Sequence, residues 1–170
     1  MSATGKTTAT TATVTKTTPT TTTVTGIDEL KKLAGNDIGA SDWIEITQER
    51  IDTFADATGD HQWIHTDPER AATGPFGAPI AHGYLTLSLF IPLFTGLLDV
   101  QGVTTKVNYG LDKVRFPAPV PVGSRIRLVA RLDSVDDVSG GVQIAVDGTV
   151  EIEGGAKPAC VLRSLSRFYV

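Results

Sequence analysis

A carboxylate and an imidazole, those of Asp60 and His65, lie close together in a segment whose residue types suit acid–base chemistry. Such a pair can hold one water molecule between them, and either group can accept a proton from that water. The pair His82-Gly83 follows at the start of an apolar stretch, where the backbone N–H of a helix start can stabilise an oxyanion. Together these residues predict a site that adds water to a polarised double bond.

The two candidate catalytic residues are predicted to lie on the connection between two helices. The apolar spacing predicts a helix that is capped by Thr47 and ends at Gly59, which allows a sharp turn. A second helix is predicted to begin directly after His65, with either Thr66 or Asp67 as its cap. Because both side chains extend from one short connection, we expect them to face a common point.

The remaining pattern predicts an α+β fold. Residues Ala81–Leu98 are apolar all round a helical wheel, which predicts a helix buried on most sides. A membrane span is not expected, because polar residues, a proline and a glycine interrupt this run. After Gly102 the chain is predicted to form strands, with a hairpin turn at Asp147-Gly148 and a last strand over Ala159–Val170. One apolar helix followed by antiparallel strands predicts a sheet wrapped around that helix.

The chain of 170 residues is long enough for one domain, which we expect over residues 26–170. Residues 1–25 are rich in threonine and have no alternating apolar face that a strand could bury, so they are predicted to be a disordered tail. The tail lacks the uninterrupted apolar segment of a secretory signal, and a cytoplasmic location is expected.

The composition argues against several classes of binding site. The net charge of −4 comes without a basic patch, so no nucleic-acid binding is expected. Cys160 is the single cysteine of the sequence, which excludes an intrachain disulfide, and its apolar surroundings predict a buried, inert thiol. No cysteine and histidine residues follow the spacing of a zinc site, so no metal is expected.

Three blocks of the sequence resemble the MaoC-like family of (R)-specific enoyl-CoA hydratases. The blocks are Ala57–Asp60 followed by His65, then Pro79–Gly83, then Val114–Val120. They occur in the family's order, and the resemblance extends over about Ser41 to Val170.

The resemblance implies a hot-dog fold, in which an antiparallel sheet wraps around a long buried helix. It also implies hydration of trans-2-enoyl-CoA to (R)-3-hydroxyacyl-CoA, or the reverse dehydration, in fatty-acid metabolism. No cofactor is expected, since coenzyme A is part of the acyl-CoA substrate. The expected assembly is a homodimer in which the sheet continues from one subunit into the other.

Specific roles follow for the candidate site. Asp60 and His65 are expected to activate the attacking water, and the Gly83 N–H to polarise the thioester carbonyl. The residues expected to contact the substrate are Gln62, Trp63, His82, Tyr84 and Arg115. The arginine could meet the phosphates of coenzyme A, but taken singly it is favoured to lie on an exposed strand face. The family commonly has Asn-Pro where this chain has Gln62-Trp63, which is expected to affect acyl preference and rate.

Two other functions fit the same residues. The first is a hot-dog acyl-CoA thioesterase, although thioester hydrolysis needs attack at the carbonyl carbon and the Asp60–His65 pair suits addition to an alkene better. The second is a non-catalytic subunit that binds acyl thioesters, which would be expected to have lost one of these two residues. Thioesters of coenzyme A and of acyl carrier protein fit the sequence equally.

Overall fold

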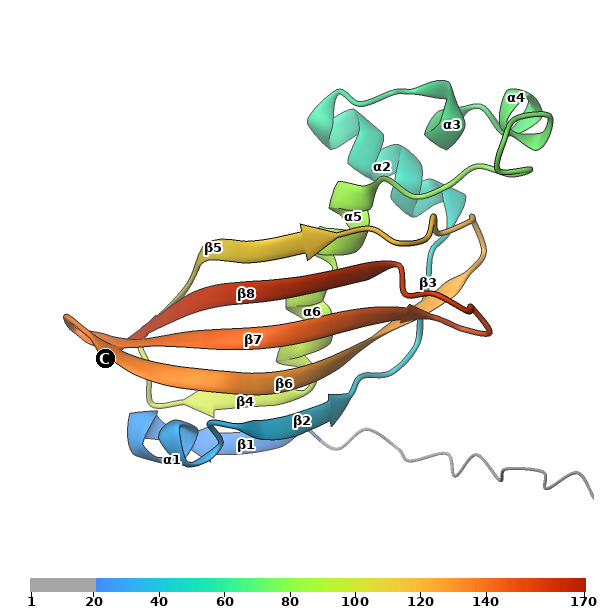
Figure 1. The fold of residues 1–170 in the computed structure, drawn as a ribbon. Coiled ribbons are helices and arrows are strands. Elements are labelled where there is room, and N and C mark those ends of the chain that lie inside the picture. The colour runs from blue at the N-terminus through green and yellow to red at the C-terminus, as the bar shows by residue number, and fades with distance from the viewer. Residues whose placement is uncertain (1–20) are drawn as a thin grey trace, which may run out of the picture.

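The structure, a computed structural model, describes residues 21–170 (Figure 1). The predicted disorder of residues 1–20 lies outside the described residues. The prediction of a disordered tail is wrong for its last residues, because Thr22–Thr25 form strand β1, which pairs in parallel with β4 (Leu98–Gln101). Threonine favours extended backbone, and β1 docks through its pairing with β4 and the burial of the Val24 side chain in the core.

The main sheet wraps around the central helices, as predicted. Within residues 21–170 it contains six strands, which pair only in antiparallel fashion in the order β2-β6-β7-β8-β5, with β3 beside β6. The strands are β2 (Asn36–Ala40), β3 (Ile44–Glu45), β5 (Thr105–Arg115), β6 (Arg125–Val138), β7 (Gly141–Ile152) and β8 (Cys160–Tyr169). Alternate residues of β6 and β7 are buried, which places one face of the sheet against the core and the other toward solvent. Cys160 is buried, and burial raises its pKa to about 11, so the prediction of a buried thiol is confirmed.

The predicted hairpin turn at Asp147-Gly148 is wrong. Both residues lie inside β7, where they pair with residues of β6 and of β8, and the chain turns instead at Ser139-Gly140. Gly148 is explained by packing, because a Cβ atom there would lie 3.2 Å from the Phe90 ring. The sequence alone does not distinguish a glycine that allows a helix to pack closely on a sheet from a glycine that forms a turn.

The predicted helix over Ala81–Leu98 forms as two shorter helices, α5 (Gly83–Ser88) and α6 (Phe90–Thr95). Pro92 has no N–H to donate to the carbonyl of Ser88, so the hydrogen-bond ladder is interrupted at their junction. Both helices cross behind the sheet in the view of Figure 1, and their buried side chains form the centre of the core. In the described part of the chain, no helix is long and apolar enough to cross a membrane.

The remaining helices lie at the two ends of the sheet. Helix α1 (Gly26–Lys32) follows β1, whereas α2 (Gln48–Thr58), α3 (Trp63–Thr66) and α4 (Pro68–Ala72) lie together beyond the opposite end (Figure 1). The side chain of Thr47 accepts the N–H of Arg50 at 3.3 Å and caps α2, as predicted. The candidate site lies where this helical group meets the start of α5.

Candidate active site

Asp60 lies just past the end of α2. Gly59 ends that helix in the left-handed conformation, with φ of 76°, and donates its N–H to the carbonyl of Ala55 at 2.8 Å. The chain therefore turns sharply and presents an exposed Asp60 beside α3. This is the predicted place of the carboxylate.

His65 lies within α3, whereas the sequence predicted a place directly before a helix. The following helix α4 is capped by Asp67, whose carboxylate accepts the N–H of Arg70 at 3.0 Å. Thr66, the alternative cap, bonds back to the carbonyls of the preceding turn instead. The residues before the cap then complete one helical turn of their own, which buries His65 to 6% exposure.

The hydrogen bond of the His65 side chain defines which ring nitrogen carries the proton. Its Nδ1 atom lies 2.7 Å from the carbonyl oxygen of Ile80, which can only accept, so Nδ1 carries the proton of the neutral ring. The other nitrogen, Nε2, is thereby left with a lone pair. Burial lowers the pKa of His65 below its ordinary value of 6.5, with the bond to Ile80 acting against this, so the ring is neutral at pH 7.

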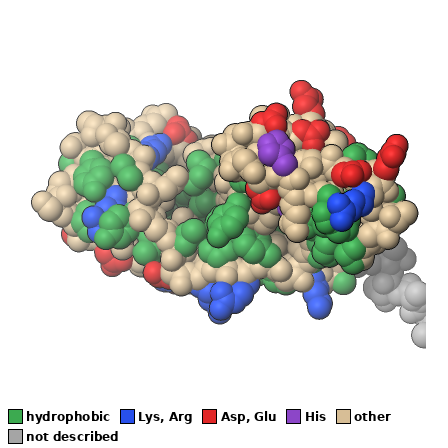
Figure 2. Space-filling model, turned by 90° about the horizontal axis from the view of Figure 1, so that it is seen from above, with side chains coloured by type: hydrophobic (Ala, Val, Ile, Leu, Met, Phe, Trp, Pro, Cys, Tyr) green, Lys and Arg blue, Asp and Glu red, His purple; other side chains and the backbone are tan. Residues whose placement is uncertain are grey.

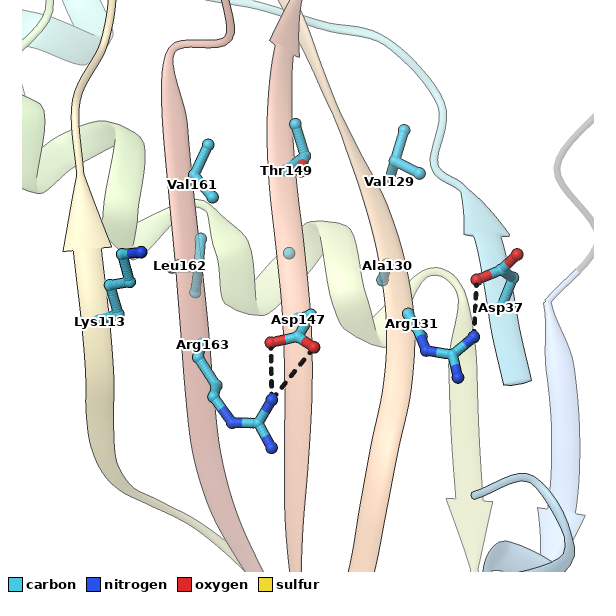
Figure 3. Close-up of a pocket in the computed structure, with 11 residues that line it drawn as sticks. Asp37, Lys113, Val129, Ala130, Arg131, Asp147, Thr149, Val161, Leu162 and Arg163 are labelled. Atoms are coloured by element: carbon cyan, nitrogen blue, oxygen red, sulfur yellow. Dashed lines mark hydrogen bonds and ion pairs between the residues drawn. The ribbon is translucent and has the colours of Figure 1, made fainter. Parts of the chain in front are cut away.

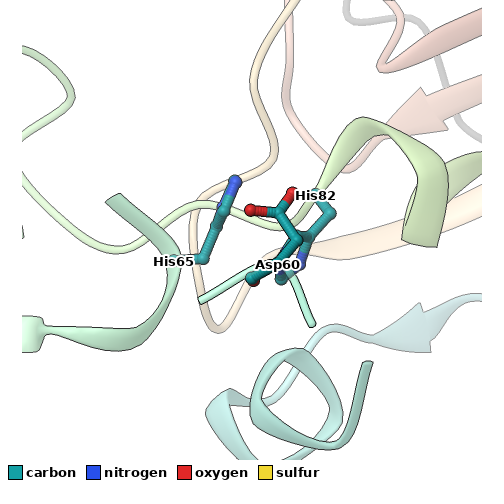
Figure 4. A group of neighbouring side chains, drawn as sticks. All are labelled: Asp60, His65 and His82. Carbon is teal, nitrogen blue, oxygen red and sulfur yellow. The ribbon is translucent and has the colours of Figure 1, made fainter. Parts of the chain in front are cut away.

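The carboxylate and the imidazole meet at one point, as the sequence predicted. Potential ligand atoms of Asp60, His65 and His82 all lie within 4.8 Å of one another, and Figure 4 shows the three side chains side by side. One water molecule can bridge two polar atoms at such a separation with two hydrogen bonds. The arrangement can therefore hold a water molecule and remove a proton from it.

A pocket of about 310 Å³ adjoins this point and includes both His65 and Gly83 in its lining. The other residues that line the pocket are Phe76, Ile80, Ala81, Thr86, Phe116, Ala118, Pro119, Val120 and Ala159. Gly83 is the first residue of α5, so the helix provides no carbonyl partner for its N–H. A Cβ atom on Gly83 would lie 3.3 Å from the Phe116 ring, which therefore covers the glycine closely. The pocket is thus a mostly apolar space with a base and a backbone donor among its lining residues.

Comparison with known proteins identifies the family. The family model described as MaoC like domain matches residues 29–154, which is more than half of the chain. The chain belongs to the MaoC-like family. The 3-hydroxyacyl-thioester dehydratase Z of Mycobacterium tuberculosis (strain ATCC 25618 / H37Rv) is 57% identical over 143 residues, which cover 84% of this chain and 95% of that protein. Nodulation protein N of Rhizobium leguminosarum bv. viciae is 47% identical over 128 residues, with coverage of 74% and 80%.

The fold of this MaoC-like protein also has solved counterparts. The unliganded R-hydratase PhaJ1 from Pseudomonas aeruginosa matches with a TM-score of 0.64 at 23% identity, covering 80% of this chain and 81% of that one. A likeness at this identity concerns the fold alone, and it confirms the predicted hot-dog arrangement.

The residues predicted to contact substrate lie in different surroundings. Tyr84 is 72% exposed, and its ring lies 6.4 Å from that of Phe116, at the edge of the pocket. Trp63 is covered by Arg70 at 4.4 Å and packs so closely on Gly74 that a Cβ atom there would meet its ring at 2.9 Å. None of the side chains predicted for substrate contact lines the pocket.

The other three residues predicted to contact substrate also lie in different places. Gln62 precedes α3 and is exposed, and Arg115 is an exposed end residue of β5 whose guanidinium bonds to the carbonyl of Val114. His82 is buried, at 2% exposure, and its ring stacks on that of His65. Sequence reasoning did not single out Phe76 as a pocket residue, although an aromatic between Pro75 and Gly77 in a loop is a detectable signal.

The MaoC-like sheet carries a second hollow on its outer face, which shares no lining residue with the pocket at His65 (Figure 3). Its volume is about 380 Å³, and charged side chains surround a floor of small apolar residues. Arg163 bonds to Asp147 at 3.0 Å, and Arg131 lies 3.6 Å from Asp37, so these charges pair with one another across the strands. Such pairs between neighbouring strands stabilise a sheet.

The trio Asp60, His65 and His82 could in principle hold a metal ion. The two imidazole rings, however, are stacked, with centroids 3.8 Å apart and an angle of 26° between their planes. The lone pairs of stacked rings lie in nearly parallel planes, whereas ligands of one zinc ion must point at a common centre. The geometry therefore favours acid–base chemistry over metal binding.

Proposed function

We propose that this MaoC-like protein hydrates trans-2-enoyl-CoA to (R)-3-hydroxyacyl-CoA, and catalyses the reverse dehydration, in fatty-acid metabolism. The observation that carries the proposal is the meeting of Asp60 and His65 beside an apolar pocket that also contains Gly83. The relationship to the 57% identical dehydratase of M. tuberculosis assigns the enzyme to the lyases.

In the proposed mechanism the Asp60–His65 pair binds one water molecule. A proton leaves this water as its oxygen forms a bond to C3 of the enoyl group, and the electrons of the double bond move toward the thioester oxygen. The Gly83 N–H donates to that oxygen while it is negative, an interaction worth about 3 kcal/mol in comparable sites. The enolate then takes a proton at C2 from the protonated pair, which restores the site.

The same arrangement suits an acyl thioester substrate, and the proposed reaction needs no cofactor. The acyl chain would lie in the apolar pocket, where burial of each methylene is favourable by about 0.8 kcal/mol. The thioester carbonyl already polarises the double bond, so water, an acid–base pair and one N–H donor suffice. We therefore propose that coenzyme A enters only as part of the substrate.

The function is tested by mixing the purified protein with crotonyl-CoA and following the ultraviolet absorbance of the conjugated enoyl thioester. We expect absorbance to fall, with (R)-3-hydroxybutyryl-CoA as product and no free thiol. Release of free thiol would indicate a thioesterase instead. No reaction with crotonyl-CoA or with a longer enoyl-CoA would favour a non-catalytic binding subunit.

The pH profile provides a second test. His65 must be neutral to accept a proton, and its pKa in the folded protein lies below 6.5 because the ring is buried. We expect kcat/KM to decline on the acid side with a midpoint below pH 6.5, because the neutral base is lost only as the lowered pKa is passed. The measurement is kcat/KM for crotonyl-CoA from about pH 5 to 8. A midpoint of this decline above pH 6.5 would contradict the role of His65 as the base.

We further propose that the protein is a homodimer joined along β5. This strand is the edge of the main sheet, and nearly all of its 11 residues are exposed. Apolar side chains stand along it, among them Val107, Tyr109 and Leu111, and Figure 2 shows hydrophobic side chains on the face that includes this edge. A long exposed edge strand with apolar side chains can pair with a strand of another chain.

Light scattering tests this dimer. The wild type should have twice the mass of one chain, which is 18.0 kDa, and Leu111→Lys should have a lower mass. A monomeric wild type would contradict the proposal.

A further inference from the structure

His82 is a buried imidazole that the proposed mechanism does not use. Its side chain is 2% exposed and does not line the pocket, so it is not placed to touch substrate. One face of its ring stacks on His65 with centroids 3.8 Å apart, and the Phe54 ring lies 5.0 Å away. A side chain in this position can affect the reaction only through the groups that it contacts.

Folding alone does not explain a histidine at this position. The Nε2 atom donates to the backbone carbonyl of Asp60 at 2.9 Å, while Nδ1 is buried and has no hydrogen-bond partner within residues 21–170. A buried polar atom without a partner destabilises the folded state. The side chain also makes no capping bond to α5, although His82 is the residue directly before that helix.

The bond from His82 joins the loop that holds Asp60 to the start of α5. Asp60 follows a glycine in the left-handed conformation, and its own N–H lies 3.5 Å from the hydroxyl of Thr58, at the limit of a hydrogen bond. The carbonyl of Asp60 is held from a position 22 residues further along the chain, at the start of α5. This bond thus fixes the catalytic loop relative to the helix that begins with Gly83.

The ring of His82 restrains the catalytic imidazole in a different way. The bond from Nδ1 of His65 to Ile80 holds one edge of the ring. The stacked ring of His82 occupies the space beside one face of His65, so the catalytic ring cannot tilt toward that side. The two contacts together determine where Nε2 of His65 points.

We propose that His82 is a positioning residue that holds Asp60 by a hydrogen bond and His65 by a ring face, and that it is not a substrate contact. This inference rests on the proposed hydratase function. The residue joins the two halves of the water-activating pair, so its loss should affect the rate of the chemical step more than the binding of substrate. Displacement of catalytic groups by about 1 Å can cost about 10²-fold in rate.

Three substitutions separate the two contacts. His82→Phe keeps a ring against His65 but removes the donor to Asp60, and His82→Gln keeps a donor but removes the ring. We expect His82→Phe and His82→Gln each to lower kcat for crotonyl-CoA about 10-fold, because each loses one of the two contacts. His82→Ala loses both contacts and should lower kcat about 10²-fold. KM should stay within about twofold of wild type, because binding energy is not the quantity removed. His61→Phe, at an exposed neighbour, is the matched control and should leave kcat unchanged.

A double substitution distinguishes positioning from a general effect on folding. In an Asp60→Asn background, His82→Phe should lower the residual rate less than about twofold, because the group that it positions is already inactive. Thermal unfolding of every variant shows whether it is folded at the assay temperature. The inference is overturned if His82→Phe and His82→Gln both retain the wild-type kcat, if KM rises instead, or if the two effects multiply. An inactive wild type would instead reject the hydratase function and this inference with it.

Discussion

Replacement of Asp60 by asparagine should lower kcat for crotonyl-CoA hydration by about 10²–10⁴-fold. Asparagine has nearly the same size and still forms hydrogen bonds, but its amide cannot take a proton from the attacking water. Asp60 is exposed, so the substitution should change the free energy of unfolding by less than about 0.5 kcal/mol. The loss of rate would then reflect chemistry and not the fraction of folded protein.

A matched control for this variant is Asp56→Asn. Asp56 lies on α2 with a side chain that is 79% exposed, and one of its carboxylate oxygens lies 3.6 Å from Nε2 of His61. The control should keep the kcat of the wild type within about twofold, as for other exposed surface positions. If Asp60→Asn behaved like the control in steady-state assays, the carboxylate would have no part in the reaction.

Replacement of His65 by asparagine should have an effect of similar size, about 10²–10⁴-fold in kcat. The amide nitrogen of asparagine occupies nearly the place of Nδ1 and can still donate to the carbonyl of Ile80. Nothing in asparagine replaces Nε2, so the base is lost while its anchoring bond is kept. Circular dichroism and the melting temperature measure whether the helical group α2–α4 is intact in this variant.

The contrast with a second variant sharpens the test of His65. His65→Gln places an amide near Nε2 and removes the donor to Ile80, so the buried carbonyl loses its partner. We expect this variant to be both inactive and less stable than His65→Asn, by about 1–3 kcal/mol in the free energy of unfolding. Substantial activity in either variant would contradict the assignment of the base.

The positions of Asp60 and Gly83 were predictable from the sequence because they depend on local signals. Gly59 ends α2 and Thr47 begins it, so the loop that holds Asp60 is defined within a few residues. The start of α5 at Gly83 is likewise marked by a change from loop residues to apolar ones. Helix ends of this kind can be predicted from the capping preferences of a few neighbouring residues.

Features that depend on distant contacts were not predictable in this way. The role of Gly148 follows from its contact with Phe90, and the sequence alone suggested a turn. Trp63 packs on Gly74 in the following loop, so its ring does not line the pocket, and its loop partner could not be named from the sequence. The docking of β1 depends on Val24 and on an available edge at β4. The role of each of these residues depends on a neighbour that only the folded chain brings into contact with it.

The most direct test of the central claim compares the wild type with the double variant Asp60→Asn/His65→Asn in hydration of crotonyl-CoA. Both side chains act on one water in the proposed mechanism, so their losses should overlap instead of multiplying. The account predicts (R)-3-hydroxybutyryl-CoA from the wild type and a double variant about as slow as the slower single variant. Formation of product at the wild-type rate by a folded double variant would contradict it.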